Sequence, residues 1–367
     1  MTGSVDTMLR MNMWEQQEIK KRNKRRKIRR RRRKLAAILA GTALISAGGY
    51  YCVDRFFATQ RTDYYKTEKV LVGVSEIYGH GAASDEEIKN KGELWTAEKE
   101  YQVELENTDL LAGINSPNAI LLDVEDNRVI AEKNAAEKIH PASMTKMMTA
   151  VLALEMIENL DEPVVLYDED FTGLYEQEAS MAGFQPGEEV TYRDLVYGII
   201  LPSGAECCLA VANRISSSEA VFADLMNQKA QEIGMNNTHF SNCTGLDSNG
   251  HTSTVEDMAK LLQYAIQNQQ FLQILSSAFY SVAPTNIHPE GFTFYSTVAG
   301  NLDSMQVNGG TILGGKTGYT EEAGLCLASL AQVYDKYYIL VTAGAEGMPG
   351  YKAAHLTDAV TVYGRIG

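Results

Sequence analysis

The sequence predicts an α+β domain in which one antiparallel sheet carries a cluster of packed helices. Residues 119–131 form two apolar strand patterns around a polar turn, which is a hairpin signal. Residues 325–333 and 337–344, near the other end of the chain, form a second pair of strand patterns. Helical patterns fill the chain between these two pairs. We therefore expect the pairs to join in one sheet against which the helices pack.

The helical segments differ in how apolar they are. Residues 141–156 are apolar on nearly every side, which is typical of a helix buried in the centre of a domain. Further helices are predicted at residues 192–201, 206–215, 220–233, 255–268 and 351–363. The last of them closes the chain.

Composition divides the 367 residues into four predicted parts. Residues 1–34 form a basic cytoplasmic tail, and residues 35–53 a transmembrane anchor. Residues 54–114, which are polar and charged, form an extracytoplasmic stalk, and residues 115–367 the catalytic domain. We expect a single-pass protein of the cell membrane, with a cytoplasmic N-terminus and the catalytic domain outside.

The anchor is predicted from hydropathy and from the charges beside it. Residues 35–53 contain no charged side chain, and a helix of nineteen residues is roughly 28 Å long, about one bilayer core. Thirteen of the fifteen residues from Lys20 to Lys34 are Lys or Arg, and such a block keeps its side of a membrane helix in the cytoplasm. Alternatives are an RNA-binding arm and a cleaved signal peptide with a site near Ala47.

The remaining chain is strongly acidic. Of the 33 Lys and Arg, 14 lie at or before Lys34, whereas only three of the 47 Asp and Glu do, so residues 35–367 carry a net charge of about −25. This charge disfavours nucleic acid as a partner. Five cysteines are too few for a disulfide scaffold, and the sequence does not assign any pairing among them.

Ser143 and Lys146 stand three residues apart at the start of the buried helix. This spacing places both side chains on one helix face, where they can touch. A serine hydroxyl becomes a good nucleophile when a base removes its proton, and a lysine becomes that base when burial lowers its pKa. A single Ser-x-x-Lys pair is common, so the pair alone does not establish catalysis.

Two later segments could complete a site. Lys316, Thr317 and Gly318 follow two glycines, in a stretch where a substrate backbone could lie along a strand edge. Lys316 could hold a carboxylate and disfavour a proton on Lys146. Ser203 lies at a corner between two predicted helices, where its hydroxyl could relay protons, although a helix-capping role is equally compatible with that position.

The order of these motifs resembles that of the serine D-alanyl-D-alanine carboxypeptidases, the low-molecular-mass penicillin-binding proteins. The likeness extends from about Pro117 to Gly364. It is carried by Pro141-Ala-Ser-Met-Thr-Lys146, Pro186-Gly-Glu-Glu-Val190, Leu201-Pro-Ser-Gly204, Asn237-Thr-His-Phe240, Thr244-Gly-Leu246, Gly315-Lys-Thr-Gly-Tyr-Thr320 and Ala323-Gly324.

The resemblance implies a β-lactamase/transpeptidase-like fold and a role for each matching residue. Ser143 would be the nucleophile, Lys146 its general base, and Ser203 an aid to proton transfer. Lys316 and Thr317 would bind the terminal carboxylate of the substrate.

The resemblance also implies where the substrate lies. Gly318 and Tyr319 would continue the substrate-binding strand, and the backbone N–H groups of Ser143 and Tyr319 would form the oxyanion hole. The expected partners are peptidoglycan stem peptides and, as covalent inhibitors, β-lactam antibiotics. The resemblance implies no cofactor.

The sequence departs from the family pattern at two positions. The middle motif usually ends in Asn, whose amide holds the substrate, but Ala205 stands there, with Glu206 as a polar neighbour. A basic residue often follows the last strand, and Lys352 is the nearby candidate.

Three other functions are compatible with parts of the pattern. A class A β-lactamase would use the Glu232-x-x-x-Asn236 match, but that segment continues into the carboxypeptidase-like Asn237-Thr-His-Phe240. A zinc D,D-peptidase needs clustered ligands, whereas the six histidines are scattered, so we expect no metal. A non-catalytic module that binds peptidoglycan would take no covalent penicillin adduct at Ser143.

Overall fold

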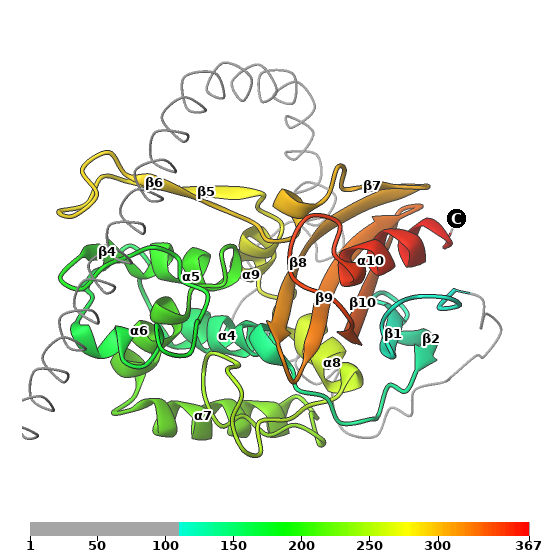
Figure 1. Ribbon diagram of the computed structural model, residues 1–367, viewed down its shortest axis with the longest axis horizontal. Coiled ribbons are helices and arrows are strands. Elements are labelled where there is room, and N and C mark those ends of the chain that lie inside the picture. The colour runs from blue at the N-terminus through cyan, green and yellow to red at the C-terminus, as the bar shows by residue number, and fades with distance from the viewer. Residues whose placement is uncertain (1–109, 367) are drawn as a thin grey trace, which may run out of the picture. The chain divides into compact units, whose positions relative to one another are not determined.

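The computed structural model describes residues 110–366 (Figure 1). The predicted tail at residues 1–34, the predicted anchor at residues 35–53 and residues 54–109 of the predicted stalk lie outside the described residues. Within residues 110–366, no helix combines the length and the apolar character that crossing a bilayer requires.

The described residues contain one large antiparallel sheet, as the sequence predicts (Figure 1). Its strand order is β2-β1-β10-β9-β8-β7, and the predicted strand pairs from the two ends of the domain meet where β1 pairs with β10. The strands are β1 (Asn118–Asp123), β2 (Arg128–Lys133), β7 (Gln306–Val307), β8 (Gly310–Thr320), β9 (Gly324–Val333) and β10 (Lys336–Ala345).

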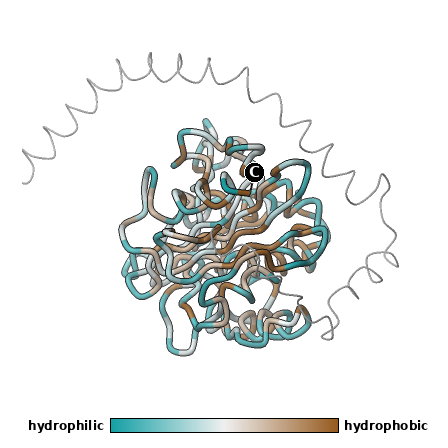
Figure 2. Tube along the Cα trace, turned by 90° about the vertical axis from the view of Figure 1, so that its right-hand side faces the viewer, coloured by the Kyte–Doolittle hydropathy of each residue, from teal (hydrophilic) through white to brown (hydrophobic). Residues whose placement is uncertain are grey.

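Both faces of the sheet are apolar and covered. On one face, Leu121 and Leu340 pack against α10 (Ala354–Gly364), which contributes Leu356 and Tyr363. Neighbouring strand residues such as Ile339 point to the opposite face, because side chains alternate along a strand. That second face meets α8 (Val255–Ala265) and α9 (Gln269–Leu275). The middle of the molecule is therefore apolar, whereas hydrophilic segments lie toward its periphery (Figure 2).

A cluster of helices lies beside and beneath the sheet (Figure 1). Its central member is α4 (Lys146–Met156), in which every residue from Lys146 to Ala153 is buried, as the apolar sequence predicts. The helices around it are α5 (Tyr192–Ile200), α6 (Ala205–Ile215), α7 (Glu219–Glu232), α8 (Val255–Ala265) and α9 (Gln269–Leu275).

Several short elements were not predicted from the sequence. They are the hairpin of β3 (Pro163–Val165) and β4 (Glu189–Thr191), the hairpin of β5 (Phe279–Val282) and β6 (Phe292–Tyr295), and the 3₁₀ turns η3 (Asp168–Phe171) and η4 (Ala299–Asn301). Strands of three or four residues are too short to produce a clear periodic signal.

The predicted helix at residues 141–156 begins with a different geometry. Residues Ala142–Thr145 form the 3₁₀ turn η2, and Ala142 has the left-handed backbone angle φ of 45°. The turn packs against Gly245, because a Cβ atom at that position would overlap the carbonyl oxygen of Ala142. Gly245 itself has φ of 81°. Close backbone packing under the turn that carries Ser143 therefore requires the glycine of the Thr244-Gly245 motif.

This packing predicts that Gly245→Ala lowers the free energy of unfolding by about 3 kcal/mol, as expected when an unfavourable φ is combined with a steric clash. Gly187→Ala is the matched control, because Gly187 also has φ of 81° but has open space where the Cβ would go. The control should lose only about 1 kcal/mol. Urea unfolding measures both values, and equal losses would contradict the packing argument.

Candidate active site

Lys146, at the first position of α4, points at the corner that carries Ser203. Its Nζ donates a hydrogen bond to the carbonyl oxygen of Ser203 at 2.5 Å and lies 3.2 Å from the Ser203 hydroxyl. The side chain is only 2% exposed. An amine at the start of a buried helix is thus held by the neighbouring corner and away from water.

Lys316, in the middle of β8, reaches the same serine from the sheet. Its Nζ lies 2.8 Å from Ser203 Oγ and 2.8 Å from the Thr317 carbonyl oxygen, and the residue is fully buried. The Ser203 oxygen therefore accepts hydrogen bonds from both amines. Because a hydroxyl has two acceptor sites and one proton, the proton of Ser203 remains available to another group.

The corner between α5 and α6 sets the position of Ser203. Ser203 adopts φ of 69°, which is unusual for a residue with a side chain. The next residue, Gly204, lies so close to Ala182 that a Cβ there would come within 2.7 Å of the Ala182 Cβ. The N-cap position of α6 is Gly204, which no side chain caps, so the structure does not show Ser203 in the capping role.

Ser143 lies in η2, where the end of β8 passes across it. A Cβ at Gly318 would lie 3.1 Å from the backbone nitrogen of Ser143, so strand and turn touch at this point. Ser143 is partly exposed, unlike its buried neighbours Met144 and Thr145. The helical cluster and the sheet therefore bring Ser143, Lys146, Ser203 and Lys316 to one junction.

Both buried amines have lowered pKa values. Burial, and after it the charge of Lys146, lowers the pKa of Lys316 well below its usual value. Burial also lowers the pKa of Lys146, while Cys208 and Glu206 act in the opposite direction. Two cations so close together in a dry site oppose each other, which favours a neutral amine on at least one of them.

Thr317 and Tyr319 continue β8 beyond Lys316. The Thr317 hydroxyl lies 2.7 Å from the hydroxyl of Thr297, and both residues are partly exposed. Tyr319 directs its hydroxyl away to the sulfur of Met348. Sequence reasoning missed Thr297, because a threonine after a short strand has no distinguishing pattern.

The outer edge of β8 is largely open in the described part of the chain. Strand β7 pairs with β8 only at Gly310 and Thr311, which leaves the stretch around Lys316 without a strand neighbour on that side. Such an edge can pair with an extended peptide. Gly314, just before this stretch, packs closely against α9, since a Cβ at Gly314 would overlap the carbonyl of Leu275.

The structure also places the residues at which the sequence departs from the family pattern. Ala205 is fully buried, and its N–H donates to the Ser180 carbonyl. Glu206 accepts hydrogen bonds at Oε1 from the backbone of Ala182 and Gly183, at 2.7 and 2.9 Å, so it holds that segment. Burial raises the pKa of Glu206. The basic candidate Lys352 forms an ion pair with Asp303.

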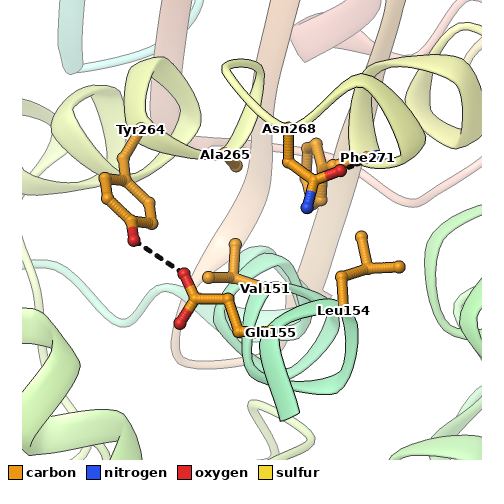
Figure 3. Close-up of a pocket in the computed structure, with 7 residues that line it drawn as sticks. All are labelled: Val151, Leu154, Glu155, Tyr264, Ala265, Asn268 and Phe271. Carbon is orange, nitrogen blue, oxygen red and sulfur yellow. Dashed lines mark hydrogen bonds between the residues drawn. The ribbon is translucent and has the colours of Figure 1, made fainter. Parts of the chain in front are cut away.

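Other groups lie away from this junction. Glu232, the residue of the β-lactamase-like match, is exposed and pairs with Lys229 at 2.8 Å. Figure 3 shows a small hollow at the far half of α4, closed by a 2.6 Å hydrogen bond from Tyr264 to Glu155. None of the predicted site residues lines it. The four described cysteines are buried free thiols, at positions 207, 208, 243 and 326.

Comparison with known proteins agrees with this geometry. The family model described as D-alanyl-D-alanine carboxypeptidase matches residues 104–347, about two thirds of the chain. The chain belongs to this family. The match includes all three motifs that converge at the junction.

Two curated relatives carry the same name. D-alanyl-D-alanine carboxypeptidase DacF of Bacillus subtilis is 33% identical over 232 residues, covering 62% of this chain and 57% of DacF. DacC of Escherichia coli is 34% identical over 237 residues, covering 62% of this chain and 56% of DacC. The chain thus spans little more than half the length of these relatives.

The fold is also that of solved structures in this group. The crystal structure of the Streptomyces K15 DD-transpeptidase superposes with a TM-score of 0.62 at 26% identity. The superposition covers 69% of this chain and 98% of that structure. It confirms the α+β, transpeptidase-like architecture predicted from the sequence.

Proposed function

We propose that this chain is a serine D-alanyl-D-alanine carboxypeptidase that removes the terminal D-Ala from peptidoglycan stem peptides through an acyl-enzyme on Ser143. The observation that carries the proposal is the convergence of Lys146 and Lys316 on the hydroxyl of Ser203, at a site where strand β8 touches the turn that carries Ser143. Family membership supports the same chemistry. In this proposal Ala205 reduces contacts to the substrate amide without removing any group that transfers a proton.

In the acylation step, Ser143 Oγ attacks the carbonyl carbon of the penultimate D-Ala, and neutral Lys146 takes the Ser143 proton. The Ser203 proton passes to the nitrogen of the departing D-Ala, and protonated Lys146 returns a proton to Ser203 across their 3.2 Å contact, so that Lys146 is neutral again. The peptide C–N bond then breaks and an ester forms on Ser143. Water later attacks this ester, and Lys146 again serves as the base.

The substrate carboxylate sets the charge of the two lysines. A carboxylate beside Lys316, held also by the hydroxyls of Thr317 and Thr297, raises the pKa of Lys316 and favours its charged form. The charge on Lys316 then lowers the pKa of Lys146 and keeps that amine neutral, as a base must be. Binding of the correct substrate terminus thus prepares the general base.

The open edge of β8 supports a binding mode for the peptide. An extended stem peptide pairs with the strand near Gly318, and its reacting carbonyl then lies at the N–H groups of Ser143 and Tyr319. These two donors stabilise the negative oxygen of the tetrahedral intermediate. β-Lactams, which present a carboxylate and a strained amide, occupy the same position and acylate Ser143.

We further propose that residues 35–53 anchor the protein in the cell membrane, with residues 1–34 in the cytoplasm and the catalytic domain outside. The support is the charge-free apolar stretch and the basic block directly before it. An external location gives the domain access to peptidoglycan, its proposed substrate. The net negative charge of residues 35–367 disfavours binding to nucleic acid.

Ser143→Ala is expected to reduce release of D-alanine from a stem pentapeptide by at least about 10³-fold, because it removes the nucleophile. Ser277→Ala is a change of the same type at a serine whose hydroxyl donates to the Gln273 carbonyl, and it should leave release unchanged. An enzymatic assay for free D-alanine provides the measurement. Release by the Ser143 variant at the wild-type rate would refute the assignment of the nucleophile.

Lys316→Met is expected to shift the acid limb of the acylation rate to higher pH. Loss of the nearby positive charge favours protonated Lys146, so its pKa rises. The limiting rate of acylation by a chromogenic cephalosporin, followed against pH, gives the shift. Lys336→Met is the surface control, and a shift to lower pH would contradict the coupling.

Membrane anchoring is tested by fractionation of cells that express the full chain or a version lacking residues 1–53 fused to a cleavable export signal. The full chain should sediment with membranes and resist extraction by carbonate. The truncated form should be released. Recovery of the full chain as a shortened soluble protein would favour the cleaved signal peptide.

A further inference from the structure

The turn that carries Ser143 is contacted from below by a loop at residues 239–252, which has no role in the mechanism above. His251 in this loop is 2% exposed, and its Nε2 lies 2.8 Å from the hydroxyl of Thr145. Thr145 is fully buried and stands between Ser143 and Lys146 in the chain. His251 therefore touches the segment that holds the nucleophile and the base.

The hydrogen bonds of His251 define which ring nitrogen carries a proton. The backbone N–H of Ser241 donates to Nδ1 at 3.0 Å, so Nδ1 must present a lone pair. Burial, with smaller effects from His239 and His140, lowers the pKa of His251 to about 4. The ring is thus neutral near neutral pH, its single proton is on Nε2, and Nε2 donates to Thr145.

A second contact joins the same loop to the same turn. Gly245 packs against the Ala142 carbonyl and comes near the Thr145 hydroxyl. Its conformation is held by Asn242, whose Oδ1 accepts the Gly245 N–H at 2.7 Å. The loop therefore supports η2 at both ends, through Ala142 and through Thr145.

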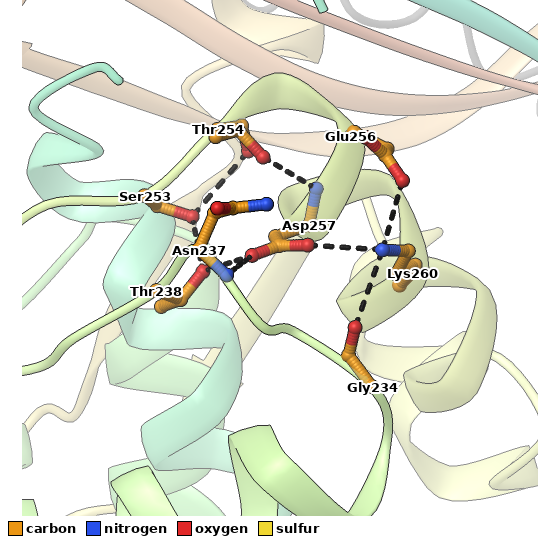
Figure 4. Close-up of polar contacts among 8 residues, drawn as sticks. All are labelled: Gly234, Asn237, Thr238, Ser253, Thr254, Glu256, Asp257 and Lys260. Carbon is orange, nitrogen blue, oxygen red and sulfur yellow. Dashed lines mark hydrogen bonds and ion pairs between the residues drawn. The ribbon is translucent and has the colours of Figure 1, made fainter. Parts of the chain in front are cut away.

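The loop is itself fixed at its base by a buried polar cluster at the start of α8 (Figure 4). Asp257 Oδ2 accepts hydrogen bonds from the backbone of Asn237 and the hydroxyl of Thr238, both at 2.8 Å. Thr238 also bonds Ser253 across the base, at 2.8 Å. Ser253 pairs in turn with the backbone of Ile139, just before η2.

Lys260 holds the Asp257 carboxylate in this cluster. Its Nζ lies 3.1 Å from Asp257 Oδ1, 2.9 Å from Glu256 and 3.2 Å from the Gly234 carbonyl (Figure 4). A support that is bonded in this way at its base can hold a neighbouring turn in a strained conformation. The positive φ of Ala142 shows that η2 needs such support.

We propose that His251 is a positioning residue for acylation: by donating from Nε2 to the Thr145 hydroxyl, it holds η2 in the geometry that directs Ser143 and Lys146 at the substrate. The inference rests on the proposed acyl-enzyme function and adds to it a residue that touches neither substrate nor reacting atom. A misplaced nucleophile slows the chemical step even when the substrate is bound.

The two nitrogens of the ring allow the roles of His251 to be separated. Asparagine has a polar atom where Nδ1 lies, so His251→Asn keeps the acceptor for Ser241 but loses the donor to Thr145. Glutamine reaches the position of Nε2, so His251→Gln keeps that donor. Thr145→Val removes the acceptor with little change of shape, and Thr145→Ser retains it.

The test uses the full-length protein and a chromogenic cephalosporin, with the limiting acylation rate and the dissociation constant measured separately by stopped flow. His251→Asn and Thr145→Val should each lower the limiting rate about tenfold, the value of one buried hydrogen bond. The dissociation constant should stay within about twofold of wild type, since the substrate-binding contacts on β8 are intact. His251→Gln and Thr145→Ser should recover most of the rate.

The combined Thr145→Val and His251→Asn variant should be no slower than either single variant, because both remove the same interaction. His355→Asn is the matched control. His355 is also buried, at 3% exposure, and its pKa is also lowered to about 4, but it lies in α10. It should lose stability without a change in the acylation rate.

Multiplying effects in the combined variant, or an equal loss of rate in His355→Asn, would overturn the inference in favour of general destabilisation. Wild-type acylation rates in both Thr145→Val and His251→Asn would overturn it as well. If His251→Asn does not fold, Thr145→Val and Thr145→Ser test the inference instead: it holds if only Thr145→Val lowers the acylation rate, and it fails if both variants acylate at the same rate. If the cephalosporin does not acylate the wild-type protein, the proposed function itself is overturned. A wild-type acylation rate in the His251 and Thr145 variants would overturn only the role of His251.

Discussion

Two buried lysine amines share one serine hydroxyl, and the rest of the site depends on this contact. Lys146 comes from the helical cluster, Lys316 from the sheet, and Ser203 from the corner between α5 and α6. The contact exists only if all three elements meet at one point. Burial of two like charges destabilises the fold, and the free energy lost must be offset by packing in the rest of the domain. Groups buried at such a cost are often functional.

The surroundings of this contact are rigid where the chemistry needs alignment. Ala142 and Ser203 both adopt left-handed backbone angles, and each is held by a close backbone neighbour. The 239–252 loop supports the first, and the Ala182 segment, bound by Glu206, supports the second. Strained residues next to a nucleophile are tolerated when the packing around them leaves no alternative.

Apolar periodicity was sufficient to predict strands β1, β2, β9 and β10 and the buried helix, but not β7 and β8. That the motifs form one site was implied by their resemblance to a known family. The sequence could not reveal Thr297 or His251, whose roles arise from contacts across 20 and 106 positions of the chain. Nor could it show that Gly314 is required for the close approach of α9. Such close approaches are set by tertiary packing, which leaves no local pattern.

Lys146 and Lys316 lie in a buried site where a charge on one amine disfavours a charge on the other. NMR titration of the lysine side-chain ¹³Cε resonances in the full chain tests this directly, with single Lys146→Met and Lys316→Met variants for assignment. We expect two resonances that titrate below the ordinary lysine pKa, and in each variant the remaining one should move back upward, because its charged neighbour is gone. Titration of both lysines at the ordinary value, in wild type and variants alike, would contradict the account.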